Sequence, residues 1–389
     1  MATFFLILIY ITFISLGLPD SLLGSAWPAL HLDIASPLAG AGVISCIVTG
    51  GTIISSLMTD RLVRWLGTGK LTAISVLMTA CALVGFSLTP GFWWLCLLAA
   101  PLGLGAGAVD AGLNNYVALH YAARHMSWLH CFWGIGATAG PAIMSLFLAQ
   151  NGNWRGGYRL IGVIQLCLTA VLFCTLPLWK KRTESVGDGA PASGLTARAA
   201  LRLPLAKPAV LAFFCYCGIE TTTNLWAASF LTTTRGLTAE AAARGTSLFF
   251  LGVTLGRLLT GFATARMSNC NLIRVGQGLC LAGVLLTALP LPTALSLAGL
   301  GLVGLGCAPI YPCMLHETPR RFGKEVAQSM MGLQMACAYV GSSLVPTLAG
   351  ALSGPLTLYV MPAVQLVLLV LMIWASERIN RVIPSAAGK

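Results

Sequence analysis

Long apolar stretches separated by short polar ones run through the whole chain. Each stretch is close to the length of about 20 residues that a helix needs to cross the hydrocarbon core of a membrane. The pattern therefore predicts twelve membrane-spanning helices. The predicted spans are 3–27, 40–59, 71–89, 92–118, 127–149, 158–179, 208–232, 243–265, 272–291, 293–315, 326–351 and 355–376.

Composition and charge support this interpretation. Only 9% of the 389 residues are charged, whereas soluble proteins carry roughly 25%. Basic residues collect in the cytoplasmic loops of membrane proteins. If both termini are cytoplasmic, 18 of the 23 basic residues fall on the inner side and four on the outer side. We therefore predict a multi-pass protein of the cytoplasmic (inner) membrane with both termini in the cytoplasm. The net charge of +12 arises from these loops, so no nucleic-acid partner is expected.

A polar stretch divides the predicted spans into two sets of six. Residues 180–207 include KKRTESVGDGAPASG, a composition typical of a flexible linker. We predict an N-terminal half at 1–179, a cytoplasmic linker at 180–207, and a C-terminal half with a short cytoplasmic tail at 208–389. The halves resemble each other, which indicates an internal repeat. An offset of 205 residues places Gly51 on Gly256 and Gly136 on Gly341, and one of about 201 places Asp110 on Tyr311.

Three acidic residues interrupt the apolar spans. Asp20, Asp110 and Glu220 lie on the first, fourth and seventh spans, and the other eight acids lie in loops or tails. A carboxylate at the bilayer centre costs about 2.5–3.5 kcal/mol on insertion scales, so it needs a partner, a water-filled cavity or a proton. We expect all three to couple transport to protons and to contact the solute. The alternative is a structural role, in which hydroxyls or amides satisfy the carboxylate.

Polar and aromatic side chains accompany these acids. Asn114 and Asn224 each follow an acid by four residues, which places the amide on the same helical face. Trp226 supplies a ring suited to the apolar face of a sugar. Arg257 is the one basic residue that lies more than a few residues from either end of a predicted span, and we expect it to be structural. Three acids without a basic partner favour a neutral polyol or a cation over an organic anion. The candidate solute-binding residues are Asp20, Asp110, Asn114, His130, Glu220, Asn224, Trp226 and Tyr311.

Two parallel six-helix halves joined by a basic linker resemble the major facilitator superfamily. The loop TDRLVRWLGTGK at 59–70 is similar to the cytoplasmic motif of that superfamily, with Asp60, Arg61 and Arg64 as its charged members and Ser56 where the motif has glycine. The resemblance implies an all-α membrane fold of twelve helices in two six-helix pseudo-repeats. It also implies that the first, fourth, seventh and tenth spans surround a central cavity, which the three acids and Tyr311 would line.

Six stretches resemble one branch of that superfamily, the fucose permease-like sugar–proton symporters. They are SLGLPDSLLGSAWP, GLGAGAVDAGLNNYVA, LHCFWGIGATAGP, FFCYCGIETTTNLWAASFL, LGVTLGRLLTG and GLGCAPIYPCML. This resemblance implies that Asp20 and Asp110 serve proton coupling and sugar binding, and that His130 contacts the sugar. Asp110 stands where a fucose permease has Glu, and Glu220 is an additional acid. The resemblance therefore implies a sugar or a related polar solute rather than fucose itself.

These observations predict a proton-coupled secondary transporter of a small polar solute, a sugar or sugar derivative, that works by alternating access. Other readings stay open. GATAGP at 136–141 partly matches the Gly-x-x-x-Gly-Pro element of antiporters, which would make the chain a proton-driven exporter. Na⁺ could replace H⁺ as the coupling ion. A membrane receptor or scaffold that does not transport is a further alternative.

The sequence contains no sign of enzymatic chemistry. It has no histidine cluster, nucleophile triad or phosphate-binding loop. The thirteen cysteines lie almost entirely in apolar runs, where cysteine acts as a small hydrophobe. We expect no cofactor and no metal. The expected partners of a monomeric chain are its solute, the coupling ion and the lipid bilayer.

Overall fold

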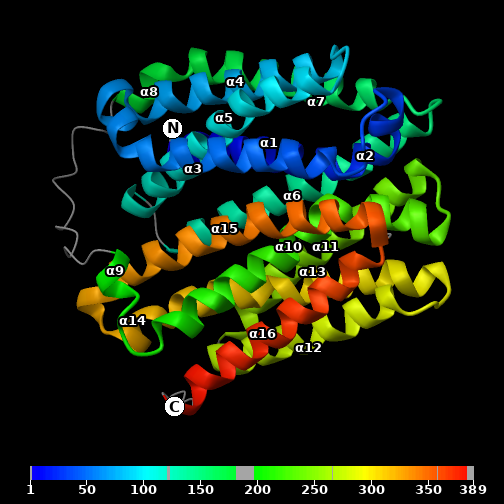
Figure 1. The fold of residues 1–389 in the computed structure, drawn as a ribbon. Helices are drawn as coiled ribbons and strands as arrows, with labels where there is room; N and C mark the ends of the chain where they lie inside the picture. Colours follow the sequence, from blue (N-terminus) through cyan, green and yellow to red (C-terminus); the bar gives the residue numbers. More distant parts are fainter. Residues whose placement is uncertain (1, 121–122, 181–196, 265, 357, 383–389) are drawn as a thin grey trace. The chain divides into compact units, whose positions relative to one another are not determined.

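The computed structural model describes residues 2–120, 123–180, 197–264, 266–356 and 358–382, and this part of the chain is helical with no strand (Figure 1). Helices suit a bilayer because they satisfy every backbone N–H and C=O group internally. Eleven segments of the described chain are long and apolar enough to cross a membrane. α10 (Ala206–Arg235) is also long, but its apolar run is interrupted by the sequence ETTTN at its centre. With α10, the described residues supply the helices of two six-helix repeats, as predicted.

The first compact unit comprises Met1–Asp188 and Leu231–Ser247. Its helices are α1 (Ala2–Asp20), α2 (Leu22–Asp33), α3 (Gly40–Leu66), α4 (Thr68–Ser87), α5 (Phe92–His120), α6 (Ala123–Leu148), α7 (Trp154–Cys174) and α8 (Leu176–Lys180). Within this unit α1 lies against α6, α3 lies against α5, and α4 contacts both α5 and α7.

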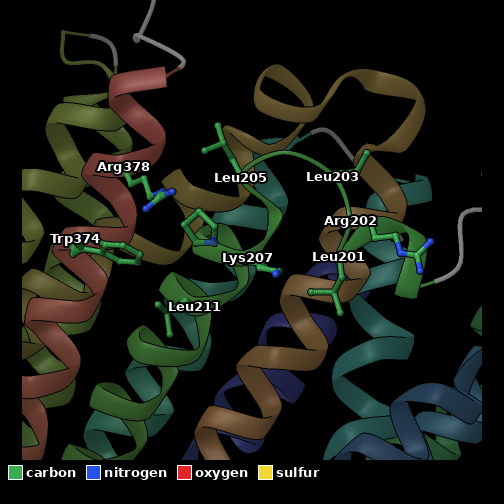
Figure 2. A pocket seen from close by; sticks show the side chains of 9 residues that line it. Leu201, Arg202, Leu203, Leu205, Lys207, Leu211, Trp374 and Arg378 are labelled. Carbon is green, nitrogen blue, oxygen red and sulfur yellow. The ribbon is translucent and has the colours of Figure 1, made fainter.

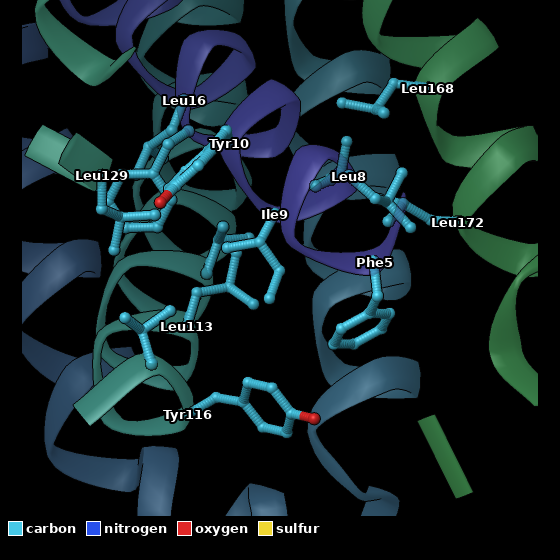
Figure 3. Packing of buried hydrophobic residues seen from close by; sticks show 14 of the residues in the cluster. Phe5, Leu8, Ile9, Tyr10, Leu16, Leu113, Tyr116, Leu129, Leu168 and Leu172 are labelled. Atoms are coloured by element: carbon cyan, nitrogen blue, oxygen red, sulfur yellow. The ribbon is translucent and has the colours of Figure 1, made fainter. Parts of the chain in front are cut away.

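Side chains of α1, α5, α6 and α7 form the core of the first unit. Figure 3 shows Phe5, Leu8, Ile9, Tyr10 and Leu16 beside Leu113, Tyr116, Leu129, Leu168 and Leu172. A buried amide also joins three helices. Gln165 of α7 donates a 2.7 Å hydrogen bond to the carbonyl of Ser15 on α1 and accepts one of 2.7 Å from Thr79 on α4. Such bonds hold spans together in lipid, where apolar side chains have no preference for protein over acyl chains.

The second compact unit comprises Gly189–Phe230 and Leu248–Lys389. Its helices are α9 (Ala197–Ala200), most of α10, α11 (Ala239–Ala263), α12 (Asn269–Ala288), α13 (Thr293–His316), α14 (Thr318–Phe322), α15 (Lys324–Leu356) and α16 (Val360–Val382). The end of α10 and the start of α11 belong to the first unit. Within the second unit α12 lies against α13 and α16, and α15 contacts α9, α14 and α16.

Close helix contacts recur at equivalent places in the two units. A Cβ atom on Gly136 of α6 would lie 2.0 Å from the carbonyl oxygen of Ile14 on α1. A Cβ atom on Gly341 of α15 would lie 2.4 Å from that of Phe214 on α10. Small residues permit such approaches between membrane helices. The glycines are 205 residues apart, as predicted, and their contacts are 200 apart.

The second span of each half follows a different offset from the predicted one. A Cβ atom on Gly51 of α3 would lie 2.9 Å from the amide nitrogen of Leu104, and one on Gly252 of α11 would lie 2.9 Å from that of Leu305. Both pairs are 201 residues apart, so Gly51 corresponds to Gly252 and the predicted pairing with Gly256 was wrong. The predicted pairing was off by one helical turn, because α11 has a glycine at 252 and another at 256.

Candidate functional site

Asp20 is the last residue of α1, at the point where the first span breaks before α2. The break follows Pro19, which lacks a backbone N–H and disturbs the helix around it. Two contacts with α6 hold the break in place. Ser21 Oγ donates a 2.9 Å hydrogen bond to the carbonyl oxygen of Ala137, and Trp133 Nε1 donates one of 2.8 Å to Asp20 Oδ2. The carboxylate is therefore oriented by a neighbouring helix.

Asp110 lies on α5, where Asn114 one turn later donates a 2.9 Å hydrogen bond from Nδ2 to its Oδ1. α5 contacts α1, the helix that ends at Asp20. Among the described residues, the buried Oδ1 of Asn114 has no hydrogen-bond partner. The structure thus gathers Asp20, Asp110, Asn114 and Trp133 within the first unit, and we call these four residues the N-half acid cluster.

His130 lies on α6, one turn before Trp133. Its side chain is exposed, and its ring meets that of Phe13 on α1 edge-on at a centroid distance of 6.2 Å. Residues three apart share a helical face, so His130 is beside the N-half acid cluster. His125, on the same helix, is more buried than His130. Its Nδ1 lies 2.8 Å from the hydroxyl of Tyr10.

Glu220 lies on α10 and has a basic partner. Its Oε1 is 3.7 Å from an η nitrogen of Arg257 on α11, and both side chains are about one-fifth exposed. Tyr216, one turn earlier on α10, lies on the same helical face as this carboxylate. The expectation of three acids without a basic partner was therefore wrong. Arg257 balances the charge of Glu220, and we call these two residues the C-half ion pair.

Tyr311 lies on α13 beside two aromatic residues of α10. Its ring centroid is 5.4 Å from that of Phe213 and 5.7 Å from that of Tyr216. Its hydroxyl donates to the sulfur of Met335 on α15. These contacts bring Tyr311 to the aromatic residues beside the C-half ion pair, within the second unit.

Trp226 does not present an open ring. It is fully buried, and its Nε1 donates a 2.8 Å hydrogen bond to the carbonyl oxygen of Pro346 on α15. The expectation that this ring covers a sugar is therefore not met by the structure. Asn224 differs, because it is only partly buried on the face of α10 that carries Glu220.

The repeat relates the candidate residues of the two units. The 200-residue offset between α1 and α10 makes Asp20 equivalent to Glu220, and the 201-residue offset between α5 and α13 makes Asp110 equivalent to Tyr311. Each half thus has an acid at the same place on its first helix. The partners differ, since an indole N–H from α6 serves Asp20 and a guanidinium from α11 serves Glu220.

Trp133 and Arg257 belong to these clusters and Tyr216 lies beside the C-half ion pair, but none of the three was predicted as a site residue. Tyr216 precedes Glu220 by four residues, so helical spacing alone could have identified it. Trp133 reaches Asp20 from another helix, and no local spacing in the sequence signals that contact.

The predicted cytoplasmic motif is only partly described. Arg61 is exposed near the end of α3, and the side chains of Asp60 and Arg64 lie outside the described residues.

In the described part of the chain, no three His, Cys, Asp or Glu side chains gather in a way that could hold a metal ion.

Comparison with known proteins decides the family. The model of the Major Facilitator Superfamily matches residues 9–346. The chain belongs to this superfamily. The family and the fold are those of multi-pass membrane transporters rather than enzymes. The predicted resemblance and fold class are thereby confirmed.

Relatives with similar sequences include sugar transporters. The chain is 23% identical over 323 residues to the glucose/mannose transporter GlcP of Bacillus subtilis, covering 79% of this chain and 77% of GlcP. It is 24% identical over 283 residues to Bypass of stop codon protein 6 of Saccharomyces cerevisiae, covering 66% of this chain but only 56% of that relative. The chain therefore spans little more than half the length of the yeast protein.

Solved transporter structures share the fold across the chain. The nucleoside transporter NupG matches with a TM-score of 0.75 at 14% identity, covering 97% of this chain and 98% of its own. The E. coli fucose:proton symporter FucP matches with a TM-score of 0.63 at 16% identity and the same coverage.

Proposed function

We propose that this protein is a proton-coupled transporter of a sugar or sugar derivative that works by alternating access. The observation that carries the proposal is the N-half acid cluster, in which Asp20 and Asp110 lie on two contacting helices of an apolar unit and each accepts a side-chain hydrogen bond. A proton on one carboxylate removes a charge that is costly in a membrane. Asp110 takes this proton, and Asp20 stays oriented by Trp133.

The C-half ion pair supports a neutral solute. Arg257 compensates Glu220 internally, so that side of the site needs no charge from the solute. At 3.7 Å the pair is longer than the 2.7–2.9 Å of a direct charge-assisted bond. The Glu220 carboxylate therefore keeps capacity to accept a hydrogen bond from a hydroxyl group. Asn224 adds an amide on the same face of α10, and Asn114 offers its unpartnered oxygen to a hydroxyl from the first unit.

The relatives guide the choice of solute. GlcP is named as a glucose/mannose transporter and FucP as a fucose:proton symporter. A further relative from Danio rerio, 25% identical over 164 residues, is named as a sodium-dependent glucose transporter. Hexoses are therefore the first compounds to test, with H⁺ as the coupling ion in our proposal and Na⁺ as the competing one.

The proposal includes the arrangement in the membrane. The halves at 1–179 and 208–389 rock about a solute site near the bilayer midplane, and residues 180–207 join them in the cytoplasm. The protein acts as a monomer in the inner membrane with both termini cytoplasmic. Asp60, Arg61 and Arg64 stabilise the cytoplasmic side of the transporter.

The decisive experiment uses the purified protein in proteoliposomes. A thermal-shift screen of hexoses and nucleosides first identifies a ligand, and an imposed inward proton gradient should then drive its accumulation. Asp110→Asn should abolish accumulation but retain counterflow exchange, because exchange needs no net proton movement. Glu240→Gln, at an exposed i,i+4 pair with Arg244, is the matched control and should accumulate normally.

Other outcomes would contradict the proposal in different ways. Expulsion of solute under the same gradient indicates the exporter that GATAGP favours. Accumulation that requires Na⁺ and ignores the proton gradient indicates sodium coupling. Normal accumulation by Asp110→Asn removes Asp110 from the coupling role, and binding without any transport indicates a receptor.

A further inference from the structure

A cavity of about 640 Å³ opens in the second unit, between the segment that leads into α10 and the last turns of α16 (Figure 2). Three cationic side chains line it. Arg202 and Lys207 come from the segment around the start of α10, and Arg378 comes from α16. The remaining lining is apolar, with Leu211 and Trp374 among its residues. The cavity thus combines positive charge with an apolar wall.

The described residues supply no counterion to these three cations. In the part of the chain that the structure describes, none of them forms an ion pair. The nearest acid along α16, Glu377, is already engaged by Arg274 through two hydrogen bonds of 2.7 Å. Arg378 instead lies over the ring of Trp374, with its Cζ 5.4 Å from the ring centroid. The cavity therefore attracts an anion from outside the described chain.

The apolar wall continues along α16. Val367, Val370, Leu371 and Trp374 are between 39% and 62% exposed. Their spacing of three and four residues places them on one helical face, and Arg378 follows at the end of the same face. A basic group at the end of an apolar stripe matches a lipid, whose charged headgroup sits at the membrane surface above its acyl chains.

The wall of the cavity is held by the core beneath it. Leu203 and Leu205 line the cavity and also pack against a buried cluster of Ala206, Ala209, Met330 and Ile379. Leu205 has a φ of 64°, a left-handed conformation that non-glycine residues rarely adopt. The residues on this side of the cavity are therefore anchored to the core of the unit.

We propose that this cavity binds the phosphate group of an anionic phospholipid whose acyl chains lie along α16. Arg202, Lys207 and Arg378 lie at separate places on the cavity wall (Figure 2) and together attract the charged phosphate, and the exposed stripe of α16 contacts the acyl chains. This site is separate from the acid cluster and the ion pair of the proposed transport site. It belongs to the leaflet at which residues 202, 207 and 378 emerge, which the charge distribution of the sequence predicts to be the cytoplasmic one.

Native mass spectrometry of the purified full-length protein tests the proposal with phosphatidylglycerol as the probe and phosphatidylcholine as the uncharged comparison. The variant R202Q/K207Q/R378Q should weaken phosphatidylglycerol binding by at least about tenfold, since each basic residue near an anionic surface contributes on the order of 1 kcal/mol. The control K70Q/R266Q/R381Q removes the same charge from exposed positions and should change binding less than about twofold. Equal effects of the two variants would overturn the site.

Two further measurements distinguish a lipid from a free anion. Trp374→Ala keeps all three cations and should weaken binding of phosphatidylglycerol, because the apolar wall is shortened. Inorganic phosphate at millimolar concentration should displace little lipid if the acyl chains contribute. Full displacement by phosphate, together with unchanged binding by Trp374→Ala, would show a site for a small anion and overturn the lipid assignment. If the triple variant does not give monodisperse protein, the three single substitutions are tested in its place. Unchanged binding of phosphatidylglycerol by all three would overturn the proposal.

Discussion

Trp133 and Asp20 join α6 to the end of α1 through one hydrogen bond of 2.8 Å, from the indole Nε1 to the carboxylate Oδ2. The bond falls where the first span breaks, so it positions the acid against a second helix. A donor that faces an ionised acceptor forms one of the stronger hydrogen bonds in proteins. The proposed transport mechanism gives this bond a measurable role.

Trp133→Phe removes the donor and keeps most of the ring. Loss of a hydrogen bond to a charged group costs about 1.5–3 kcal/mol, so the ratio kcat/KM for proton-driven uptake should fall by roughly tenfold or more. In an Asp20→Asn background the same substitution should lower kcat/KM little further, because the bond to the carboxylate is already changed. Uptake assays on the four proteins of this double-mutant cycle measure the coupling, and strictly additive losses would contradict a direct role for the bond.

The second prediction concerns the stability that the ion pair of Glu220 and Arg257 provides. Removing one member of a partly buried ion pair leaves the other uncompensated, at a cost of about 2–3 kcal/mol for a pair with this exposure. Glu220→Gln and Arg257→Gln should each lower the melting temperature of the detergent-solubilised protein. The double variant should recover much of that loss and still fail to transport. A double variant less stable than both singles would show that the two side chains do not compensate each other.

The sequence predicts the placement of the acids on helices but not their partners. Asp20, Asp110 and Glu220 stand out because charge is rare in long apolar runs, and α1, α5 and α10 carry them as expected. Arg257 reaches Glu220 from another helix. Such a contact depends on the rotation of two packed helices, which the periodicity of either helix alone does not determine.

Trp226 shows an error that the sequence could have prevented. It follows Glu220 by six residues, which places it roughly 240° around the helix from the acid. Asn224 follows by four residues and shares the face of the acid. The predicted group therefore combined residues from two faces of α10, and the structure buries the second face against α15.

Gln165 and Gln365 give the third prediction. They are 200 residues apart, both almost fully buried, and each bonds to the first long helix of its own unit, α1 or α10. Gln365 Nε2 donates a 2.6 Å hydrogen bond to Thr223 on α10. Gln365→Ala loses this bond and leaves a cavity, so it should destabilise the protein by about 2 kcal/mol. Differential scanning fluorimetry should show a lower melting temperature with KM for the solute unchanged.

The exposed Gln150 at the end of α6 is the matched control for this prediction. Gln150→Ala removes the same side chain from a surface position, where substitutions usually change stability by less than about 0.5 kcal/mol. Equal melting temperatures for the two variants would show that the buried amide does not hold α16 to α10.

Trp226 gives the last prediction, which separates packing from solute contact. Trp226→Phe keeps a ring in the buried site but leaves the carbonyl of Pro346 without its indole donor. The expected loss of stability is about 1–2 kcal/mol, with less than about a twofold change in KM for the solute because the ring is enclosed. Trp93→Phe provides a control on an exposed tryptophan of α5, 79% accessible, and should change neither quantity. A large rise in KM for Trp226→Phe at an unchanged melting temperature would restore the ring to the solute site and show that α15 moves away from it during transport.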